Sequence, residues 1–335
     1  MNRLRELFDS PEYYPVHIDF QRRQVKFVRM SRENYRDSVF LDLRTRHTGS
    51  EVEIRLDDLL LASASEPAPE RQVHYILHTS FCCSTLLARY FELLPSCFVL
   101  KEPRLLAQMA LSACRSGVSW DAVFNVSLRL LTRAYEPQQM VVIKPNDWCN
   151  PLGVDLLKHN NRATISFLMT PLRHYLLAIL KAEERRDWIR KRIIAGAKEA
   201  AGCRELADVN PARLTVPEAI AYMWLTHRFL YRNMASNRRY QSRVLLLNGA
   251  SLASSPEAAL KEIARLCRLP LGDRSLRELV VAPSACKYSK DLSRPYDAGS
   301  RLNEIQELEL CWGAEADAGV AWASCHGATK GVEQW

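Results

Sequence analysis

The sequence predicts an α/β protein in which helices cover both faces of a parallel β-sheet, with a small β-rich region in front of it. Three observations support this fold class. From residue 73 onward, short apolar runs rich in Val, Ile and Leu alternate with longer stretches of helical periodicity. Such runs are typical of strands buried on both faces. Before residue 64 the runs are short and partly alternating, and a segment with two prolines separates the two parts.

Residues 1–64 form the predicted β-rich N-terminal region. Four short runs bounded by polar residues have the partial period-2 alternation of strands: "YPVHIDF", "QVKFVRM", "SVFLDLR" and "EVEIRL". Residues 65–72, "SEPAPERQ", are predicted to be a linker, because prolines and charges at this density continue neither a helix nor a central strand.

The predicted α/β domain spans residues 73–312. Its expected strands are 73–78, 96–102, 140–145, 164–169 and 243–248. The expected helices are 85–94, 103–116, 119–134, 151–160, 172–200, 215–236 and 255–268. This alternation implies right-handed crossovers, and ligands in such sheets bind beyond the carboxyl ends of the strands. The tail, 313–335, is rich in Gly and Ala without strong periodicity, and we expect it to be loosely ordered.

The composition is that of a globular protein, with 47% apolar and 25% charged residues. No apolar run reaches the roughly 18 to 20 residues that cross a bilayer. The N-terminal segment also lacks the apolar core of a secretory signal, so a cytoplasmic location is expected. Ten cysteines without a C-x-x-C pair indicate buried thiols, and no metal site is expected.

The net charge of +8 favours an anionic partner. No nucleic-acid-binding motif accompanies this charge. The densest basic stretch, "EERRDWIRKR" at 183–192, is expected to be a solvated surface, because its charges spread around several faces of a helix.

The segment "HYILHTSFCCSTLLARYFELL", residues 74–94, passes from a strand through a short turn into a helix. The unpaired amides of the first helical turn and the hydroxyls of Ser84 and Thr85 would together favour an anion. The alternative is that one of these hydroxyls only caps the helix. The pattern G-x-x-x-x-G-K-[ST] is absent, and Phe81 with two cysteines leaves little backbone freedom, so an ordinary ATPase or kinase loop is not expected.

Two further strand ends carry candidate catalytic residues. Glu102 follows the second strand in "LKEPRLL", where a carboxylate can act as a general base toward a hydroxyl or an amine. Lys144 ends the third strand in "VIKPNDWCN", where an ammonium can neutralise charge on a transferring group. The alternative for Glu102 is a surface salt-bridge cluster with its basic neighbours.

Several segments, in the order of the sequence, resemble the sulfotransferase family, whose fold is a P-loop-like three-layer sandwich. Residues 81–87 lie where that family has [KR]-S-G-T-T-L-L, Glu102 matches its Glu after the second strand, and Lys144 with Pro145 resembles its K-x-P element. The stretch "FLMTPLRHYLLAILK", 167–181, fits its strand, R-x-P and helix. The stretch "VLLLNGASLASSPEAALKEIARLCRLPL", 244–271, resembles its later strand and amphipathic helix.

This resemblance implies an enzyme that moves a sulfuryl or related group to a hydroxyl or amine of an unknown small molecule or peptide. The donor would be 3′-phosphoadenylyl sulfate or a related phosphorylated nucleotide, without a metal. Glu102 would deprotonate the acceptor, and Lys144 would stabilise charge on the transferring group. The implied cofactor-binding residues are Thr79, Ser80, Cys82, Cys83, Ser84, Thr85, Arg173, Lys287, Ser289 and Lys290.

Several residues of the family pattern are replaced. The loop's basic residue is Phe81, its glycine is Cys83, and Met169 stands where an Arg precedes the proline. A charge-assisted hydrogen bond is worth roughly 1.5–3 kcal/mol, so losing three would weaken donor binding on the order of a thousandfold or more. A second hypothesis is therefore a catalytically inactive protein of this fold that serves as a binding or assembly partner.

Overall fold

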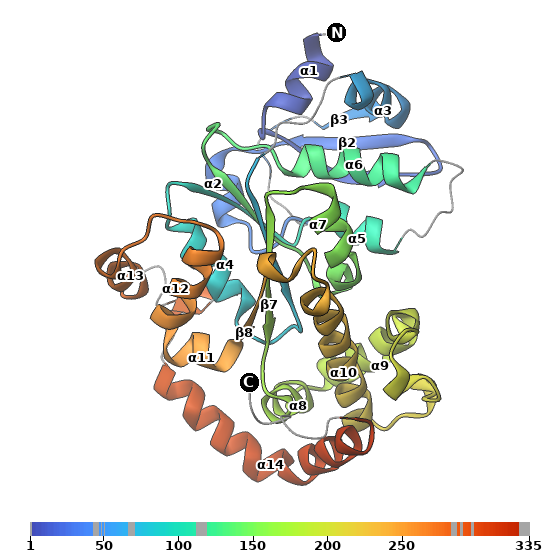
Figure 1. The fold of residues 1–335 in the computed structure, drawn as a ribbon, viewed down its shortest axis with the longest axis vertical. Coiled ribbons are helices and arrows are strands. Elements are labelled where there is room, and N and C mark those ends of the chain that lie inside the picture. The colour runs from blue at the N-terminus through green and yellow to red at the C-terminus, as the bar shows by residue number, and fades with distance from the viewer. Residues whose placement is uncertain are drawn as a thin grey trace. The chain divides into compact units, whose positions relative to one another are not determined.

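The computed structural model describes residues 2–42, 47, 49, 51–65, 71–111, 119–282, 287–288, 291–295 and 298–327 of the 335-residue chain (Figure 1). The chain divides into two compact units. One comprises Met1–Leu77 and Thr85–Ile165, and the other comprises His78–Ser84 and Ser166–Trp335.

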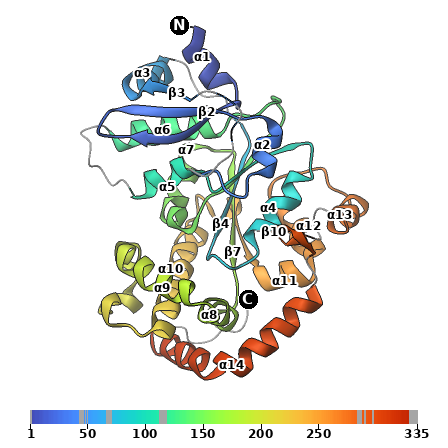
Figure 2. The ribbon, with the colours of Figure 1, turned by 180° about the vertical axis from the view of Figure 1, so that it is seen from behind.

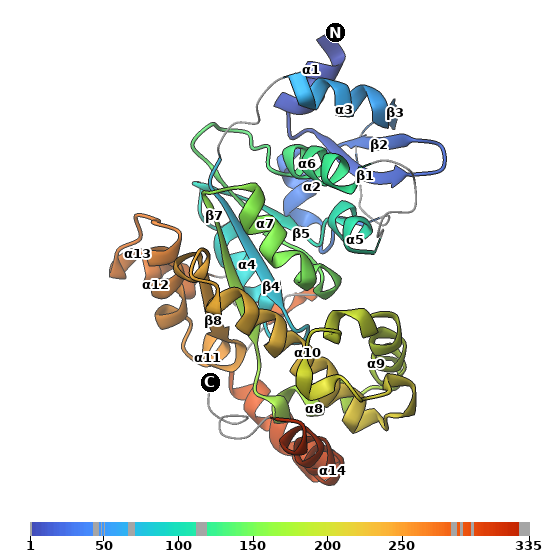
Figure 3. The ribbon, with the colours of Figure 1, turned by 45° about the vertical axis from the view of Figure 1, so that its right-hand side comes forward.

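The N-terminal region of the first unit mixes helices with a small antiparallel sheet, whose strand order is β1-β2-β3. Its elements are α1 (Asn2–Asp9), β1 (Tyr13–Asp19), β2 (Gln24–Arg29), α2 (Arg32–Asp37), β3 (Val52–Arg55) and α3 (Leu56–Ser65) (Figure 3). The strand expected in "SVFLDLR" is not formed over its described residues, 38–42. Instead, the Leu41 amide donates to the Lys101 carbonyl, and the Leu41 carbonyl accepts from the Arg104 amide and the Tyr14 hydroxyl. The apolar run is therefore anchored at one buried residue rather than paired along its length.

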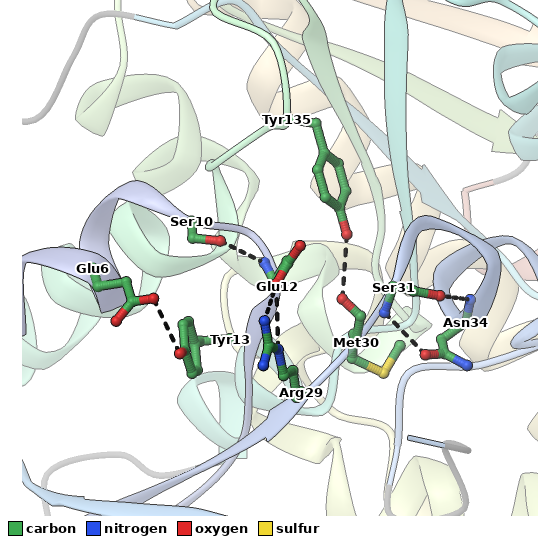
Figure 4. Close-up of polar contacts among 9 residues, drawn as sticks. All are labelled: Glu6, Ser10, Glu12, Tyr13, Arg29, Met30, Ser31, Asn34 and Tyr135. Atoms are coloured by element: carbon green, nitrogen blue, oxygen red, sulfur yellow. Dashed lines mark hydrogen bonds and ion pairs between the residues drawn. The ribbon is translucent and has the colours of Figure 1, made fainter. Parts of the chain in front are cut away.

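Side chains tie this small sheet to the connections around it (Figure 4). Arg29 pairs with Glu12 at 3.0 Å, and the Tyr135 hydroxyl donates to the Met30 carbonyl at 3.3 Å. A reciprocal pair of hydrogen bonds between Ser31 and Asn34 caps α2. These contacts connect the end of β2 to the residue before β1, to Tyr135 and to α2.

The central sheet has five strands in the order β5-β6-β4-β7-β8, and β6 pairs in parallel with both β4 and β5. The strands are β4 (Val73–His78), β5 (Cys97–Lys101), β6 (Met140–Lys144), β7 (Ala163–Met169) and β8 (Val244–Asn248). The first four are buried along their whole length, as continuous Val, Ile and Leu runs predict. The expectation of an α/β protein with a parallel sheet is confirmed.

The helices that belong to the first unit lie between these strands in sequence. They are α4 (Ser84–Glu92), α5 (Arg104–Leu111), α6 (Trp120–Leu131) and α7 (Gly153–His159), with a short 3-10 helix at Asp147–Leu152. The helices of the second unit are α8 (Leu172–Leu180), α9 (Glu183–Ala195), α10 (Val216–Ser236), α11 (Gly249–Ser254), α12 (Pro256–Leu266), α13 (Asp273–Val280) and α14 (Ala298–Cys325).

Helices α8, α9, α10 and α14 pack together in the second unit (Figure 2). The single helix expected over 172–200 is divided, because Ala182 has an extended backbone with φ −135° and ψ 130°. The chain beyond residue 313 is helical to Cys325 rather than loosely ordered. Glu309 and Asp317 of α14 both bind the Arg173 guanidinium of α8, so contacts across helices order a segment whose own periodicity is weak. None of the described helices is long and apolar enough to cross a membrane.

His227 of α10 is a titratable group inside the core of the second unit. Its side chain is 0% exposed, and neither ring nitrogen has a hydrogen-bond partner among the described residues. Burial lowers the pKa of His227 well below its usual value of 6.5, and the nearby Arg192 lowers it further. The imidazole is therefore neutral in the folded protein at pH values where it is charged in the unfolded chain.

We expect this histidine to make the second unit sensitive to acid. Above pH 6.5 both states hold a neutral imidazole, and as the pH falls below 6.5 only the unfolded state gains the proton. The free energy of unfolding should then fall by about 1.4 kcal/mol per pH unit for this one group. Denaturant titrations of the wild type and of His227→Leu at pH 7.5, 6 and 5 measure the slope. An unchanged slope in the variant would show that another group causes the loss.

Candidate functional site

The turn between β4 and α4 has a backbone conformation that L-residues rarely adopt. Ser80, Phe81 and Cys83 have φ values of 58°, 51° and 66°, although none is a glycine. Left-handed residues within a turn direct successive backbone N–H groups toward a common concavity, an arrangement that binds anions. Each such residue costs on the order of 1–3 kcal/mol unless the surroundings hold it in place. The turn is thus a strained segment that its neighbours stabilise.

Two amides of this turn are already bonded. The Thr79 amide donates to the Leu168 carbonyl of β7 at 3.0 Å, and the Ser80 amide donates to Nδ1 of His78 at 3.0 Å. Neither can donate to an anion in this arrangement. Ser84 and Thr85 begin α4, where the amides have no acceptor within the helix. Both side chains are buried, with exposures of 5% and 7%. The start of α4 therefore offers donors for an anion site at this turn.

Phe81 packs against helix α9. Its ring lies edge-on to the Trp188 ring, with the centroids 5.8 Å apart. The Arg185 guanidinium lies 4.5 Å from the centroid of the same phenyl ring. Sequence patterns predicted neither contact, because 183–192 was expected to be a solvated surface. The signal available in the sequence was the presence of a tryptophan and arginines in a stretch otherwise made of charges.

A close backbone approach fixes the cysteine pair of the turn. A Cβ atom on Gly249 would lie 2.2 Å from the Cys82 carbonyl oxygen, so only glycine fits at this place. Gly249 opens α11, and the preceding Asn248 caps that helix by accepting from the Ala250 amide at 2.8 Å. Asn248 and Gly249 thereby each have a structural reason: Asn248 caps α11, and Gly249 allows the close approach of Cys82.

In the first unit, Glu102 and Lys144 lie together at the carboxyl ends of neighbouring parallel strands. Lys144 Nζ is 2.5 Å from Glu102 Oε1, and the Glu102 amide donates to the Lys144 carbonyl. The lysine side chain is only 1% exposed, and the glutamate is 23% exposed. Glu102 itself has a left-handed backbone, with φ 51°. The two residues predicted to be catalytic thus form one ion pair, whose carboxylate reaches the surface while its ammonium does not.

Lys101, the residue before Glu102, belongs to a second ion pair. Lys101 Nζ is 2.6 Å from Glu92 Oε1 and also donates to the Arg36 carbonyl. Burial lowers the pKa of Lys101 and raises the pKa of Glu92, while their mutual attraction opposes both shifts. Lys101 is the last residue of β5 and Glu102 follows it with a left-handed backbone, and the two side chains take different partners. The polar cluster at this strand end is therefore two separate pairs.

The other residues predicted to bind the cofactor are Arg173, Lys287, Ser289 and Lys290. Arg173 is bound by Glu309 at 2.6 and 2.7 Å and by Asp317 at 2.5 Å, and these carboxylates raise the pKa of its guanidinium. Lys287 lies in the two-residue strand β9 (Lys287–Tyr288), which pairs with β10 (Asp291–Pro295). Ser289 and Lys290 lie outside the described residues. Over the part of the chain that the structure describes, no group of three His, Cys, Asp or Glu side chains could hold a metal ion.

Comparisons with known proteins concern the fold. No protein-family model matches the chain, and no curated protein matches it. Among solved structures, the sulfotransferase domain from the curacin biosynthetic pathway is 11% identical, over 77% of this chain and 99% of that one, with a TM-score of 0.38. Sulfotransferase STF1 from Mycobacterium tuberculosis H37Rv is 13% identical, over 75% and 80%, with a TM-score of 0.43. Mouse sulfotransferase SULT7A1 complexed with PAP is 10% identical, over 82% and 97%, with a TM-score of 0.37.

At these identities and TM-scores, the three structures assign no chemistry to this chain.

Proposed function

We propose that the protein is a sulfotransferase-like enzyme that moves a sulfuryl or related group from an anionic nucleotide donor to a hydroxyl or amine. The observation that carries this proposal is the Glu102–Lys144 pair at the carboxyl ends of neighbouring parallel strands. Ligands of such sheets bind at this edge. A partly exposed carboxylate at this edge can take a proton from an acceptor, and the buried Lys144 ammonium holds that carboxylate in place.

In this proposal the chain's residues have distinct roles. The acceptor oxygen or nitrogen attacks the sulfur, the bond from sulfur to the nucleotide's phosphate oxygen breaks, and the acceptor's proton passes to the Glu102 carboxylate. Lys144 supplies positive charge near the transferring group. The amides of Ser84 and Thr85 at the start of α4 bind the anionic end of the donor.

The residues present fit an anionic group at the start of α4. The donor supplies an activated sulfuryl group when bound. The geometry assigns no described residue to a 3′-phosphate, because Arg173 is occupied by Glu309 and Asp317. We propose 3′-phosphoadenylyl sulfate or a related phosphorylated nucleotide as the donor because the start of α4 suits its anionic end, while its 3′-phosphate has no assigned partner among the described residues.

A non-catalytic role as a binding or assembly partner is the second candidate. The observation that favours it is the commitment of the Thr79 and Ser80 amides to protein acceptors. A protein that has lost donor binding would still keep a buried ion pair at a sheet edge as part of its structure.

Ligand-dependent stabilisation separates the two candidates. We expect adenosine 3′,5′-bisphosphate to raise the unfolding temperature, because a ligand at 100 times its Kd stabilises the folded state by about 2.7 kcal/mol. ATP and inorganic sulfate serve as comparisons. Glu102→Gln, which keeps a hydrogen-bond acceptor, should abolish turnover with little change in bisphosphate affinity. A folded wild-type protein that responds to none of these anions would favour the non-catalytic role.

A further inference from the structure

Phe81 occupies the place where a cationic side chain would serve an anion-binding turn, and its contacts suggest how that charge is replaced. Resting on the proposed function, we propose that Arg185 of α9 supplies the positive charge of this turn, with the Phe81 ring as its platform. The ligand class is a sulfate or phosphate group at the end of an organic donor.

The geometry holds Arg185 in a fixed place. Its guanidinium lies 4.5 Å from the Phe81 ring centroid, and its Nη1 donates to the Ala178 carbonyl of α8 at 2.5 Å. Trp188, one helical turn further along α9, packs edge-on against the same phenyl ring. A guanidinium on an aromatic face keeps its edge N–H groups available, because stacking uses only the flat face. Among the described residues, Nε and Nη2 of Arg185 have no hydrogen-bond partner.

Three other cations of the second unit are neutralised by carboxylates. Arg173 is bound by Glu309 and Asp317, Lys181 by Glu304, and Arg192 by Glu199. Arg185 has no carboxylate partner within ion-pair distance among the described residues. Because it stacks on a residue of the turn itself, its charge is placed where an incoming anion would be held.

Arg186 provides an internal comparison. It follows Arg185 in the same helix, donates Nη1 to the Leu180 carbonyl and stacks 5.0 Å from a ring centroid, but that ring is Trp312 of α14. The two arginines thus share a helix, a backbone anchor and an aromatic platform. They differ in which aromatic residue they stack on, and only Phe81 belongs to the turn.

This arrangement explains a phenyl ring in an anion-binding turn. A lysine or arginine in the turn would contribute its own charge, whereas the Phe81 ring contacts the guanidinium of Arg185 in α9. In this proposal the Phe81 ring, which packs on α9, lines the anion site.

Isothermal titration with adenosine 3′,5′-bisphosphate and with inorganic sulfate tests the proposal on the full chain. Arg185→Gln should weaken bisphosphate binding about tenfold or more and reduce its salt dependence, whereas Arg186→Gln should bind as the wild type does. Phe81→Leu keeps an apolar side chain without a π face and should weaken binding by a smaller factor, a few-fold. If Arg185→Gln does not fold, Arg185→Lys keeps the charge without the planar stack and should show an intermediate affinity.

Equal affinities for Arg185→Gln and the wild type would overturn the role of Arg185 while leaving the anion site intact. An equal loss in both arginine variants would show that overall charge, and not the Phe81 platform, governs binding. A wild-type protein that binds neither probe would overturn the proposed function together with this inference.

Discussion

Replacing Glu102 by alanine should lower the free energy of unfolding by about 3 to 5 kcal/mol, because the variant leaves the ammonium of Lys144 buried without a counter-charge. The Lys144 side chain is 1% exposed and lies 2.5 Å from Glu102 Oε1, so water cannot easily replace the carboxylate. The Phe40 ring, whose centroid is 5.9 Å from Nζ, offers only a weak alternative partner. Urea titration followed by circular dichroism measures the difference.

The chain offers a matched control for this experiment. Lys158 and Asp155 form an ion pair at 3.1 Å whose side chains are 57% and 39% exposed. Asp155→Ala should therefore change stability by about 1 kcal/mol or less.

A double variant tests whether the unpaired ammonium of Lys144 causes the loss of stability. Glu102→Leu with Lys144→Met removes both charges and should recover most of the stability, but not the activity. Equal effects of Glu102→Ala and Asp155→Ala would mean that Lys144 reaches solvent in the absence of its partner, and the buried-pair description would then be wrong.

Replacing Gly249 by alanine should destabilise the second unit by about 1 to 3 kcal/mol and disturb the turn that precedes α4. The added Cβ would lie 2.2 Å from the Cys82 carbonyl oxygen and 2.9 Å from its carbon. Both are backbone atoms and cannot rotate away, so the turn or α11 has to shift. Because Cys82 lies between two left-handed residues, Phe81 and Cys83, a shift there changes the direction of the amides at the start of α4.

Gly272 is the control for this substitution. It precedes α13 with φ −82° and ψ 168°, which any residue adopts, and a Cβ there would meet nothing within 4 Å. Gly272→Ala should lower the free energy of unfolding by about 1 kcal/mol or less, because Gly272 is the N-cap of α13 and alanine caps a helix less well, and it should leave the ligand response unchanged. Thermal unfolding with and without adenosine 3′,5′-bisphosphate gives both stability and ligand response. A Gly249→Ala protein with wild-type stability and ligand response would contradict the close approach of α11 and Cys82.

The sequence predicted the strands of the central sheet well, because their signal is local. Each strand is a short run of Val, Ile and Leu between polar residues, and the observed bounds of β4 are those expected. Helix α10 also begins and ends within one residue of the expected 215–236, since Thr215 and Glu218 form a capping box at its start. These elements carry their start and stop signals in neighbouring residues.

The failures involve segments whose structure depends on distant partners. The run "SVFLDLR" has the alternation of a strand, but the backbone of Leu41 bonds to Lys101 at the end of β5 and to Arg104 at the start of α5. The segment after residue 313 has weak periodicity, yet it continues α14, and its Asp317 pairs with Arg173 of α8. Local patterns do not report such contacts, because the residues involved lie far apart in sequence.

For the candidate site, the sequence by itself determined which residue types stand at the strand ends: Glu102, Lys144 and the hydroxyls of Ser84 and Thr85. The periodicity that places the strands also places these residues. Only the tertiary structure decided which charged side chains form ion pairs with each other, because ion pairs join residues that lie far apart in sequence. It paired Glu102 with Lys144, neutralised Arg173, and set Arg185 on Phe81 without a carboxylate partner among the described residues.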